Sequence, residues 1–314
     1  MDRRQLLKTL ASALAAPLAA QTPNPAPQSP AGQAPNPAGK QPERRAPMVI
    51  VYSQDLVQID YPELGDIVKQ MGFDGVDLSI QPGGHVEPRL ANVDLVRAFE
   101  VMEGNTLAVP IITTALTTAM DRTAVPVLAL AGMSGARLFR PGNWPIGNPA
   151  NLAVRLSEVT RDLAGLLTIG RQYNMAAAFY NGTGETVGTA ISDVQRILEP
   201  LDPNLSGYYF DVANAAQQGG TGWDAALRTA LPRLKAVSIQ DFALDKDKKV
   251  VRCPLGQGTI DWPKFFQVLA QANFLGPVTL HVGYPTRDMP GAFNSDLQFA
   301  RKQIQTAWGI GPRT

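Results

Sequence analysis

The chain has 314 residues, and its 28 Lys and Arg against 27 Asp and Glu give a formal net charge of +1 at pH 7. A chain so close to neutral lacks the strong positive field by which proteins hold nucleic acid, so we expect no such partner. The single cysteine, Cys253, excludes an internal disulfide and a CxxC metal motif, and two histidines, His85 and His281, exclude an all-histidine metal cage.

The amino terminus has the pattern of an export signal. Residues 1–20 read "MDRRQLLKTLASALAAPLAA", a basic head followed by Leu and Ala and then by small residues. Within it, "RRQLLK" resembles a twin-arginine export motif; an ordinary secretion signal is the alternative. The run is too short and too weakly apolar for a membrane span. We therefore expect a periplasmic or secreted protein that is not an integral membrane protein once the signal is removed.

A proline-rich segment follows at residues 21–47. Eight of its 27 residues are proline, and none is Leu, Ile, Val or aromatic. Such a segment cannot bury enough apolar surface to offset the entropy of ordering it. We expect a disordered, extended linker there and one folded domain over residues 48–314.

From Met48 onward, short apolar runs alternate with longer amphipathic runs. The short runs predict strands, at 48–53, 75–80, 107–114, 136–140, 175–180, 207–211, 235–240 and 277–282. The longer runs predict helices, at 61–72, 94–104, 124–133, 151–174, 191–201, 222–234, 262–273 and 294–308.

Eight strand–helix units in one domain predict an α/β fold, the (β/α)₈ TIM barrel. The alternative is a doubly wound open sheet. No Gly-rich phosphate-binding fingerprint follows the first strand, and this counts against a dinucleotide-binding fold.

In a TIM barrel the active site lies at the carboxyl ends of the strands. The stretch "SGYYFD" therefore makes Asp211 the leading candidate. The other candidates at strand ends are Ser53, Asp77, Thr113, Thr114, Arg140, Tyr180, Asn181, Gln240, Asp241 and His281, and those on loops are His85, Glu87, Glu185 and Asn214.

Several candidates have an ordinary structural alternative. Asp77 lies within a strand, and its structural alternative is local pairing or capping. Arg140 either clamps a ligand oxygen or pairs with a carboxylate. His281 is either a core residue or part of the site. His85 lies on the Gly-rich loop "QPGGHVEP", where the backbone allows close approach of a ligand.

Six stretches, in this order, resemble the xylose isomerase-like superfamily of sugar phosphate isomerases and epimerases. They are "GFDGVDLSIQPGGHVEP" (72–88), "NGTGETVG" (181–188), "GYYFDVANAAQQGG" (207–220), "VSIQDF" (237–242), "PLGQGTIDW" (254–262) and "GPVTLHVGY" (276–284).

The resemblance implies a divalent metal, Mn²⁺, Mg²⁺, Co²⁺ or Zn²⁺, held by Glu, Asp, His and Glu from strand ends. Asp211 matches the aspartate ligand, and His281 matches the histidine of the last strand. Asp241 and Tyr284 also match, but the other metal and acid–base positions are substituted, by Tyr180, Gly182, Asn214, Ser238, Gln240 and Gly283. One carboxylate among neutral donors is a poor site for a hard cation, so we predict a degenerate metal site with Asp211 as its remaining ligand.

Three functions remain open. The first is a sugar or polyol isomerase, epimerase or lyase, with Asp211 and His281 as the acid–base pair and with Arg140 and Asn181 steadying negative charge. The second is a non-catalytic carbohydrate-binding barrel. Its binding residues would be Asp211, Tyr180, Asn181, Asn214 and Gln240. The third is a structural role, in which Asp211 only caps the following turn. Because export separates the protein from cytoplasmic sugar phosphates, we expect an unphosphorylated sugar.

Overall fold

The structure is a computed structural model that describes residues 45–311. The predicted export signal, residues 1–20, lies outside the described residues, as does the predicted linker up to residue 44. The first described residues already pack on the domain, since Ala46 contacts the hydrophobic core and Pro47 is buried.

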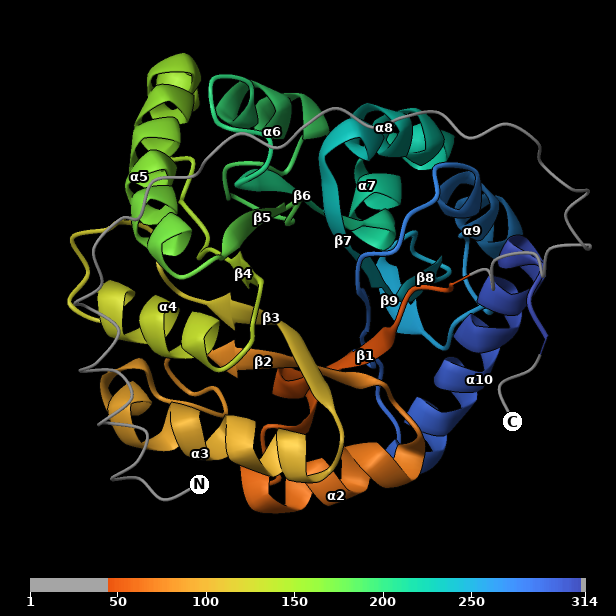
Figure 1. The fold of residues 1–314 in the computed structure, drawn as a ribbon. Coiled ribbons are helices and arrows are strands. Elements are labelled where there is room, and N and C mark those ends of the chain that lie inside the picture. Colours follow the sequence, from red (N-terminus) through yellow and green to blue (C-terminus); the bar gives the residue numbers. More distant parts are fainter. Residues whose placement is uncertain (1–44, 312–314) are drawn as a thin grey trace, which may run out of the picture. The chain divides into compact units, whose positions relative to one another are not determined.

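Eight parallel strands close into a barrel (Figure 1). Around the barrel the order is β1, β10, β7, β6, β5, β4, β3 and β2. The strands are β1 Val49–Tyr52, β2 Gly75–Ile80, β3 Ala108–Thr114, β4 Leu138–Arg140, β5 Ala176–Tyr180, β6 Ser206–Asp211, β7 Leu234–Ile239 and β10 Val278–Leu280. The predicted TIM barrel is confirmed, and closure of β1 on both β2 and β10 rules out an open sheet.

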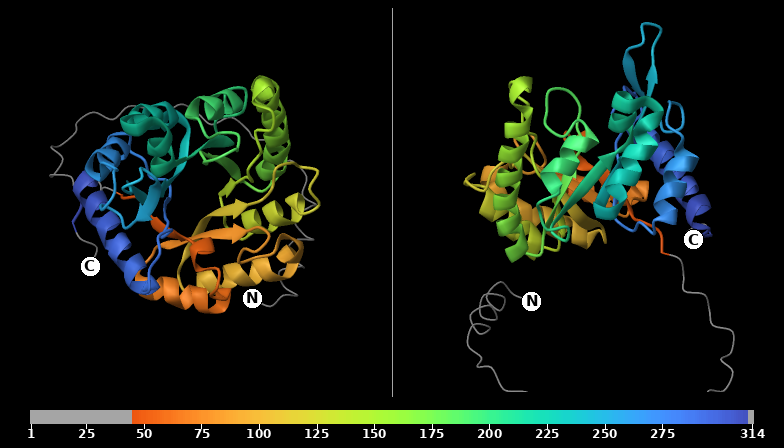
Figure 2. Two further views of the ribbon diagram at one scale, coloured as in Figure 1. Left: turned by 180° about the vertical axis from the view of Figure 1, so that it is seen from behind. Right: turned by 90° about the horizontal axis from the view of Figure 1, so that it is seen from above.

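Helices surround the strands (Figures 1 and 2). They are α2 Tyr61–Met71, α3 Ala91–Gly104, α4 Ala124–Met133, α5 Leu152–Gln172, α6 Ile191–Leu198, α8 Trp223–Ala230, α9 Trp262–Gln271 and α10 Met289–Trp308. The predicted signals work at α2, which has Pro62 in its first turn and ends at Gly72 with φ 86°. Within residues 45–311, none of the helices combines the length and the apolar character that crossing a membrane requires.

Two elements differ from the sequence prediction. The helix α7, Val212–Gly219, begins directly after Asp211. Strands β8, Asp241–Leu244, and β9, Val250–Cys253, form an antiparallel hairpin after β7. This hairpin projects from the carboxyl end of the barrel (Figure 2, right). The helix follows β6 without a break, and the hairpin begins one residue after β7. Because both are short, the expected alternation of strands and longer helices did not reveal them.

The inside of the barrel holds a small apolar cluster that includes one buried polar contact. Its buried members are Ile50, Ile111, Ala178, Tyr209 and Ala236. The Tyr209 hydroxyl donates across the interior to Asp77 Oδ2 on β2 at 2.8 Å. The large hydrophobic core lies between the strands and the helices. The barrel interior is therefore filled with side chains, and the strand ends at its mouth are where a TIM barrel places its site.

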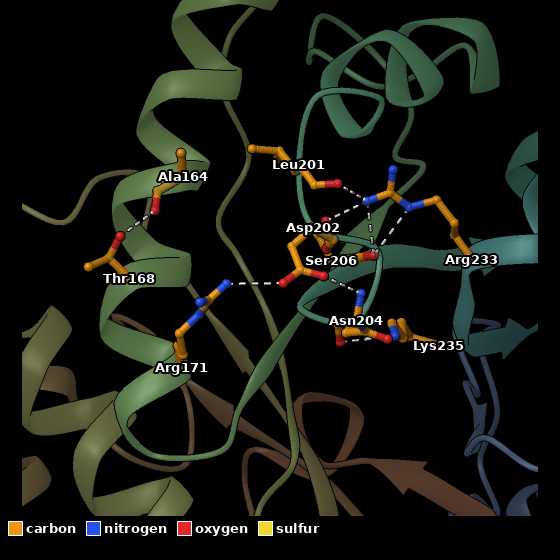
Figure 3. A network of polar contacts seen from close by, with 9 residues as sticks. All are labelled: Ala164, Thr168, Arg171, Leu201, Asp202, Asn204, Ser206, Arg233 and Lys235. Carbon is orange, nitrogen blue, oxygen red and sulfur yellow. Dashed lines mark hydrogen bonds and ion pairs between the residues drawn. The ribbon is translucent and has the colours of Figure 1, made fainter.

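The amino end of the barrel is closed by polar contacts at the start of β6 and β7 (Figure 3). Arg233 donates to the carbonyl of Leu201 at 2.9 Å and to the Oγ of Ser206 at 2.7 Å. Nearby, Arg171 forms an exposed ion pair with Asp202 at 3.0 Å. These contacts join α5, β6 and β7 at the end opposite to the mouth, where they serve stability.

Candidate ligand-binding site

Asp211, at the end of β6, is the polar centre of the barrel mouth. Its side chain is fully buried. The Oδ2 atom accepts hydrogen bonds from Tyr180 Oη at 2.7 Å, Ser238 Oγ at 2.9 Å and Gln240 Nε2 at 2.5 Å. These donors come from β5, from β7 and from the residue after β7. One carboxylate oxygen therefore ties the two neighbouring strands to β6.

The other oxygen of Asp211 caps α7. Asp211 Oδ1 accepts from the backbone N–H of Asn214 at 2.8 Å, which is a standard N-cap contact. Asn181 is bound to the Asp211 backbone on both sides: its Oδ1 accepts from the Asp211 N–H at 2.7 Å, and its Nδ2 donates to the Asp211 carbonyl at 3.0 Å. The amide of Asn181, predicted to bind substrate, is thus occupied by the strand next to it.

Tyr180 links Asp211 to a fixed positive charge. Burial, and then the charge of Asp211, raise the pKa of Tyr180 well above its usual value. The phenol therefore stays protonated near neutral pH and donates to Asp211. On the face of its ring, Arg140 Cζ lies 3.9 Å from the centroid, a close cation–π contact. Asp211 positions the ring, and the ring positions the guanidinium.

A polar cavity of about 200 Å³ opens beside these residues. It is lined by Arg140, Asn143, Tyr180, Gly182, Thr183, Thr186, Asn214, Gln240 and Arg252. Four of the predicted site residues meet here: Arg140, Tyr180, Asn214 and Gln240. Arg252, on β9, was not predicted, because the hairpin that carries it was not; the β-branched pair in "KKVVRC" was the available signal.

His281 lies apart from Asp211. Its Nδ1 is 3.5 Å from Asp55 Oδ2, and its ring centroid is 4.6 Å from that of Tyr52. Its Nε2 is buried and has no hydrogen-bond partner among the described residues. No described contact joins His281 to Asp211, so the two predicted acid–base residues are not brought together as a hydrogen-bonded pair.

Asp77 lies deeper, within β2, and belongs to the barrel interior. It is fully buried and accepts hydrogen bonds at 2.8 Å from Thr113 Oγ1 and from Tyr209 Oη. Burial raises the pKa of Asp77 to about 6. These contacts give Asp77 a structural role, but they run to β3 and across the barrel interior to β6, and are not the local pairing or capping considered for it.

Two further candidates hold loops in place. His85 Nε2 lies 2.9 Å from the Ile59 carbonyl, and burial lowers the pKa of His85, so it is a neutral anchor for the loop after β2. Asp241 accepts from Trp262 Nε1 at 2.9 Å and from the backbone N–H groups of Gly256 and Gly258. Neither His85 nor Asp241 lines the cavity.

The residues around Asp211 do not fit a divalent metal. A carboxylate offers about four lone-pair sites, and Asp211 already accepts four hydrogen bonds from neutral donors. A cation would have to displace several of them, and the Arg140 guanidinium on the Tyr180 ring would repel it. Within residues 45–311, no three His, Cys, Asp or Glu side chains come together as ligands.

Comparison with known proteins identifies relatives of the fold. The sequence pattern of the family described as xylose isomerase-like TIM barrel matches residues 66–303. No curated protein sequence matches the chain significantly.

Solved structures of similar fold include three sugar-related or metal-bound barrels. A D-allulose 3-epimerase from Methylomonas sp. has a TM-score of 0.66 and 13% identity over 82% of this chain and 98% of its own. A 3-keto-D-glucoside 4-epimerase from E. coli has a TM-score of 0.64 and 16% identity over 82% of this chain and 99% of its own. A xylose isomerase-like TIM barrel protein from Mycobacterium smegmatis, in complex with magnesium, has a TM-score of 0.65 and 13% identity over 85% of this chain and 100% of its own. At these identities the likeness shows the fold alone.

We predict that Asp211→Asn lowers the free energy of unfolding by about 2–3 kcal/mol. The amide nitrogen would face three groups that now donate to Oδ2. Urea unfolding of the full chain measures the loss, with the exposed Asp66→Asn on α2 as the matched control, expected within about 0.5 kcal/mol of wild type. Equal stability of the two variants would show that Asp211 does not organise the mouth.

Asp77 should make stability depend on pH. Its folded pKa of about 6 lies above the ordinary 3.8, so the folded state binds a proton that the unfolded state releases between these values. The contribution of this proton to the free energy of unfolding is on the order of 3 kcal/mol. It is complete below about pH 4 and is lost as the pH rises through 6. In urea unfolding, the free energy of unfolding of Asp77→Asn should therefore rise relative to that of wild type between pH 4 and pH 7. A constant difference across that range would contradict the raised pKa.

Proposed function

The chain belongs to the xylose isomerase-like TIM barrel family, and from this premise we propose that its barrel mouth binds a small carbohydrate without a divalent metal. The observation that carries the proposal is the bonding of Asp211. The family's aspartate position is kept, but neutral donors from both neighbouring strands fill its carboxylate. Two of these donors, Tyr180 and Gln240, also line the cavity of about 200 Å³.

The lining suits hydroxyl groups. Gln240 donates a hydrogen bond from Nε2 to Asp211, and its Oε1 forms no hydrogen bond to the described residues. Asn143, Thr183 and Thr186 add an amide and two hydroxyls, which can both donate and accept. The names of the similar structures support a sugar, since they include an epimerase of D-allulose and one of a 3-keto-D-glucoside. The proposal is a site that recognises a polyol through fixed neutral groups and two arginines.

A second candidate is a metal-free isomerase or epimerase in which His281 is the general base. One observation favours it: Asp55 lies beside Nδ1 of His281, while the buried Nε2 has no partner in the described chain. A carboxylate behind one ring nitrogen orients the other toward a proton to be removed. In this version Asp211 is a positioning residue, because its lone pairs are occupied.

Calorimetry of the full chain, stripped with chelator, tests the proposal. We expect Mn²⁺, Mg²⁺, Co²⁺ and Zn²⁺ to bind no tighter than about 1 mM. We expect saturable binding of a sugar such as D-allulose that weakens in Gln240→Ala and persists in Arg171→Gln at the opposite end of the barrel. Micromolar metal binding that Asp211→Ala abolishes would contradict the proposal.

The two candidates separate on turnover. If bound sugar is converted without metal, and His281→Gln stops the conversion while leaving sugar affinity intact, the metal-free enzyme is correct. Saturable binding without conversion supports a binding protein.

We also propose export by the twin-arginine route, with the periplasm or exterior as destination. The support is the sequence "RRQLLK" and the proline-rich segment after it. Replacing Arg3 and Arg4 by lysine should retain the protein in the cytoplasm, as followed by cell fractionation. Unchanged export of this variant would contradict the twin-arginine route and favour general secretion.

A further inference from the structure

We propose that the ligand of the mouth cavity carries an oxyanion, a carboxylate or a phosphate ester, held between Arg140 and Arg252. The inference rests on the proposed function, because it names the class of carbohydrate that the same cavity takes. Its basis is the state of these two guanidinium groups, which line one cavity and are left with N–H groups unused.

Arg252 reaches the cavity from the projecting hairpin. Among residues 45–311, its guanidinium forms one hydrogen bond, a long one from Nη2 to Asn214 Oδ1 at 3.4 Å. Its Nη1 is buried and has no partner in the described part of the chain. An unmatched N–H buried away from water costs about 1–3 kcal/mol, and more when the group is charged. Such a group is stabilised when a ligand supplies the missing acceptor.

Arg140 approaches the same cavity from the end of β4. The contact with the Tyr180 ring fixes the guanidinium, yet the one hydrogen bond that this group forms to the described residues is from Nη2 to Asn143 Oδ1 at 3.4 Å. Its Nε is buried without a partner among residues 45–311. Arg140 therefore has a fixed position and almost no hydrogen-bond acceptor, the opposite of an arginine that serves packing.

Structural arginines elsewhere in the barrel have more acceptors. Even Arg301, whose buried Nε also lacks a partner among residues 45–311, donates to the Gly72 carbonyl and pairs with Asp74. Arg233 donates five hydrogen bonds at the amino end, most of them to backbone carbonyls (Figure 3). Arg155 donates to the Pro145 carbonyl at 2.9 Å and pairs with Glu158 at 2.9 Å. The fold thus supplies acceptors where an arginine holds the structure together. It supplies almost none at the mouth.

The charge of the cavity points the same way. Its lining holds two arginines and no Asp or Glu. Neither arginine forms an ion pair with any described carboxylate, and Asp211, behind Tyr180, is already bound by neutral donors. A guanidinium presents paired donors that match a carboxylate or phosphate. Two of them around one cavity favour an anion over a neutral sugar, while Gln240 and Asn143 remain for hydroxyl groups.

The test compares three probes that share one ring and differ only at carbon 6: D-glucose, D-glucuronate and D-glucose 6-phosphate, with inorganic phosphate as the minimal anion. Calorimetry with the full chain should show an anionic probe binding at least about tenfold tighter than D-glucose. Arg140→Gln and Arg252→Gln should each remove about tenfold or more of that affinity, and added salt should weaken it. Arg171→Gln, an exposed arginine at the other end, should bind like wild type.

The outcomes distinguish the anion-binding inference from the proposed carbohydrate function on which it rests. Preference for D-glucuronate or for D-glucose 6-phosphate supports the inference and identifies the oxyanion; preference for the phosphate would also contradict the expectation, drawn from export, of an unphosphorylated sugar. Equal binding of D-glucose and its acids, unchanged in both arginine variants, overturns the inference and leaves the carbohydrate function standing. Binding of inorganic phosphate that needs both arginines, with no sugar bound, supports the anion site and overturns the carbohydrate function.

Absence of binding by every anionic probe up to millimolar concentration overturns the inference. Thermal unfolding of each variant checks folding. Arg140→Lys and Arg252→Lys keep the charge and lose the paired donors, so partial recovery of anion affinity in them shows that the arginines act on the ligand and not through the fold.

Discussion

The buried carboxylate of Asp211 is the constraint on which the barrel mouth depends. A charge without exposure to water must find its hydrogen bonds within the protein. Asp211 finds four of them, from Tyr180, Ser238, Gln240 and the backbone of Asn214. These bonds fix β5, β6, β7 and α7 relative to one another. They also hold the Tyr180 ring on which the Arg140 guanidinium rests.

This arrangement changes the electrostatics of the mouth. A site for a divalent cation needs several oxygen ligands with free lone pairs, whereas here the carboxylate that matches the aspartate ligand already accepts three hydrogen bonds at Oδ2 and one at Oδ1. The positive charge comes instead from two guanidinium groups that belong to the chain, one on β4 and one on the β8–β9 hairpin. In our account these groups bind the ligand, and Asp211 acts by positioning rather than by coordination. At the amino end, by contrast, Arg233 donates to backbone carbonyls and Ser206, and Arg171 pairs with Asp202.

The sequence predicted the barrel because its signal is the alternation of strands and helices, repeated eight times. It also placed Arg140, Tyr180 and Asp211 at strand ends, since that placement needs only the strand boundaries. The contact of Tyr209 with Asp77 could not be predicted from the sequence. It joins residues 132 positions apart and depends on the register and tilt of strands across the closed barrel. Arg252 was missed because four-residue strands carry little signal, and α7 because its eight residues follow Asp211 without a break.

The most direct test is a crystal structure of the full chain grown with Mn²⁺, with diffraction recorded so that the anomalous signal of manganese locates the ion. The account predicts no manganese bound to Asp211 and a Tyr180 hydroxyl still within hydrogen-bonding distance of Oδ2. A manganese ion bound to Asp211, with Tyr180 or Gln240 turned away to admit it, would contradict the account and restore a metal-dependent site.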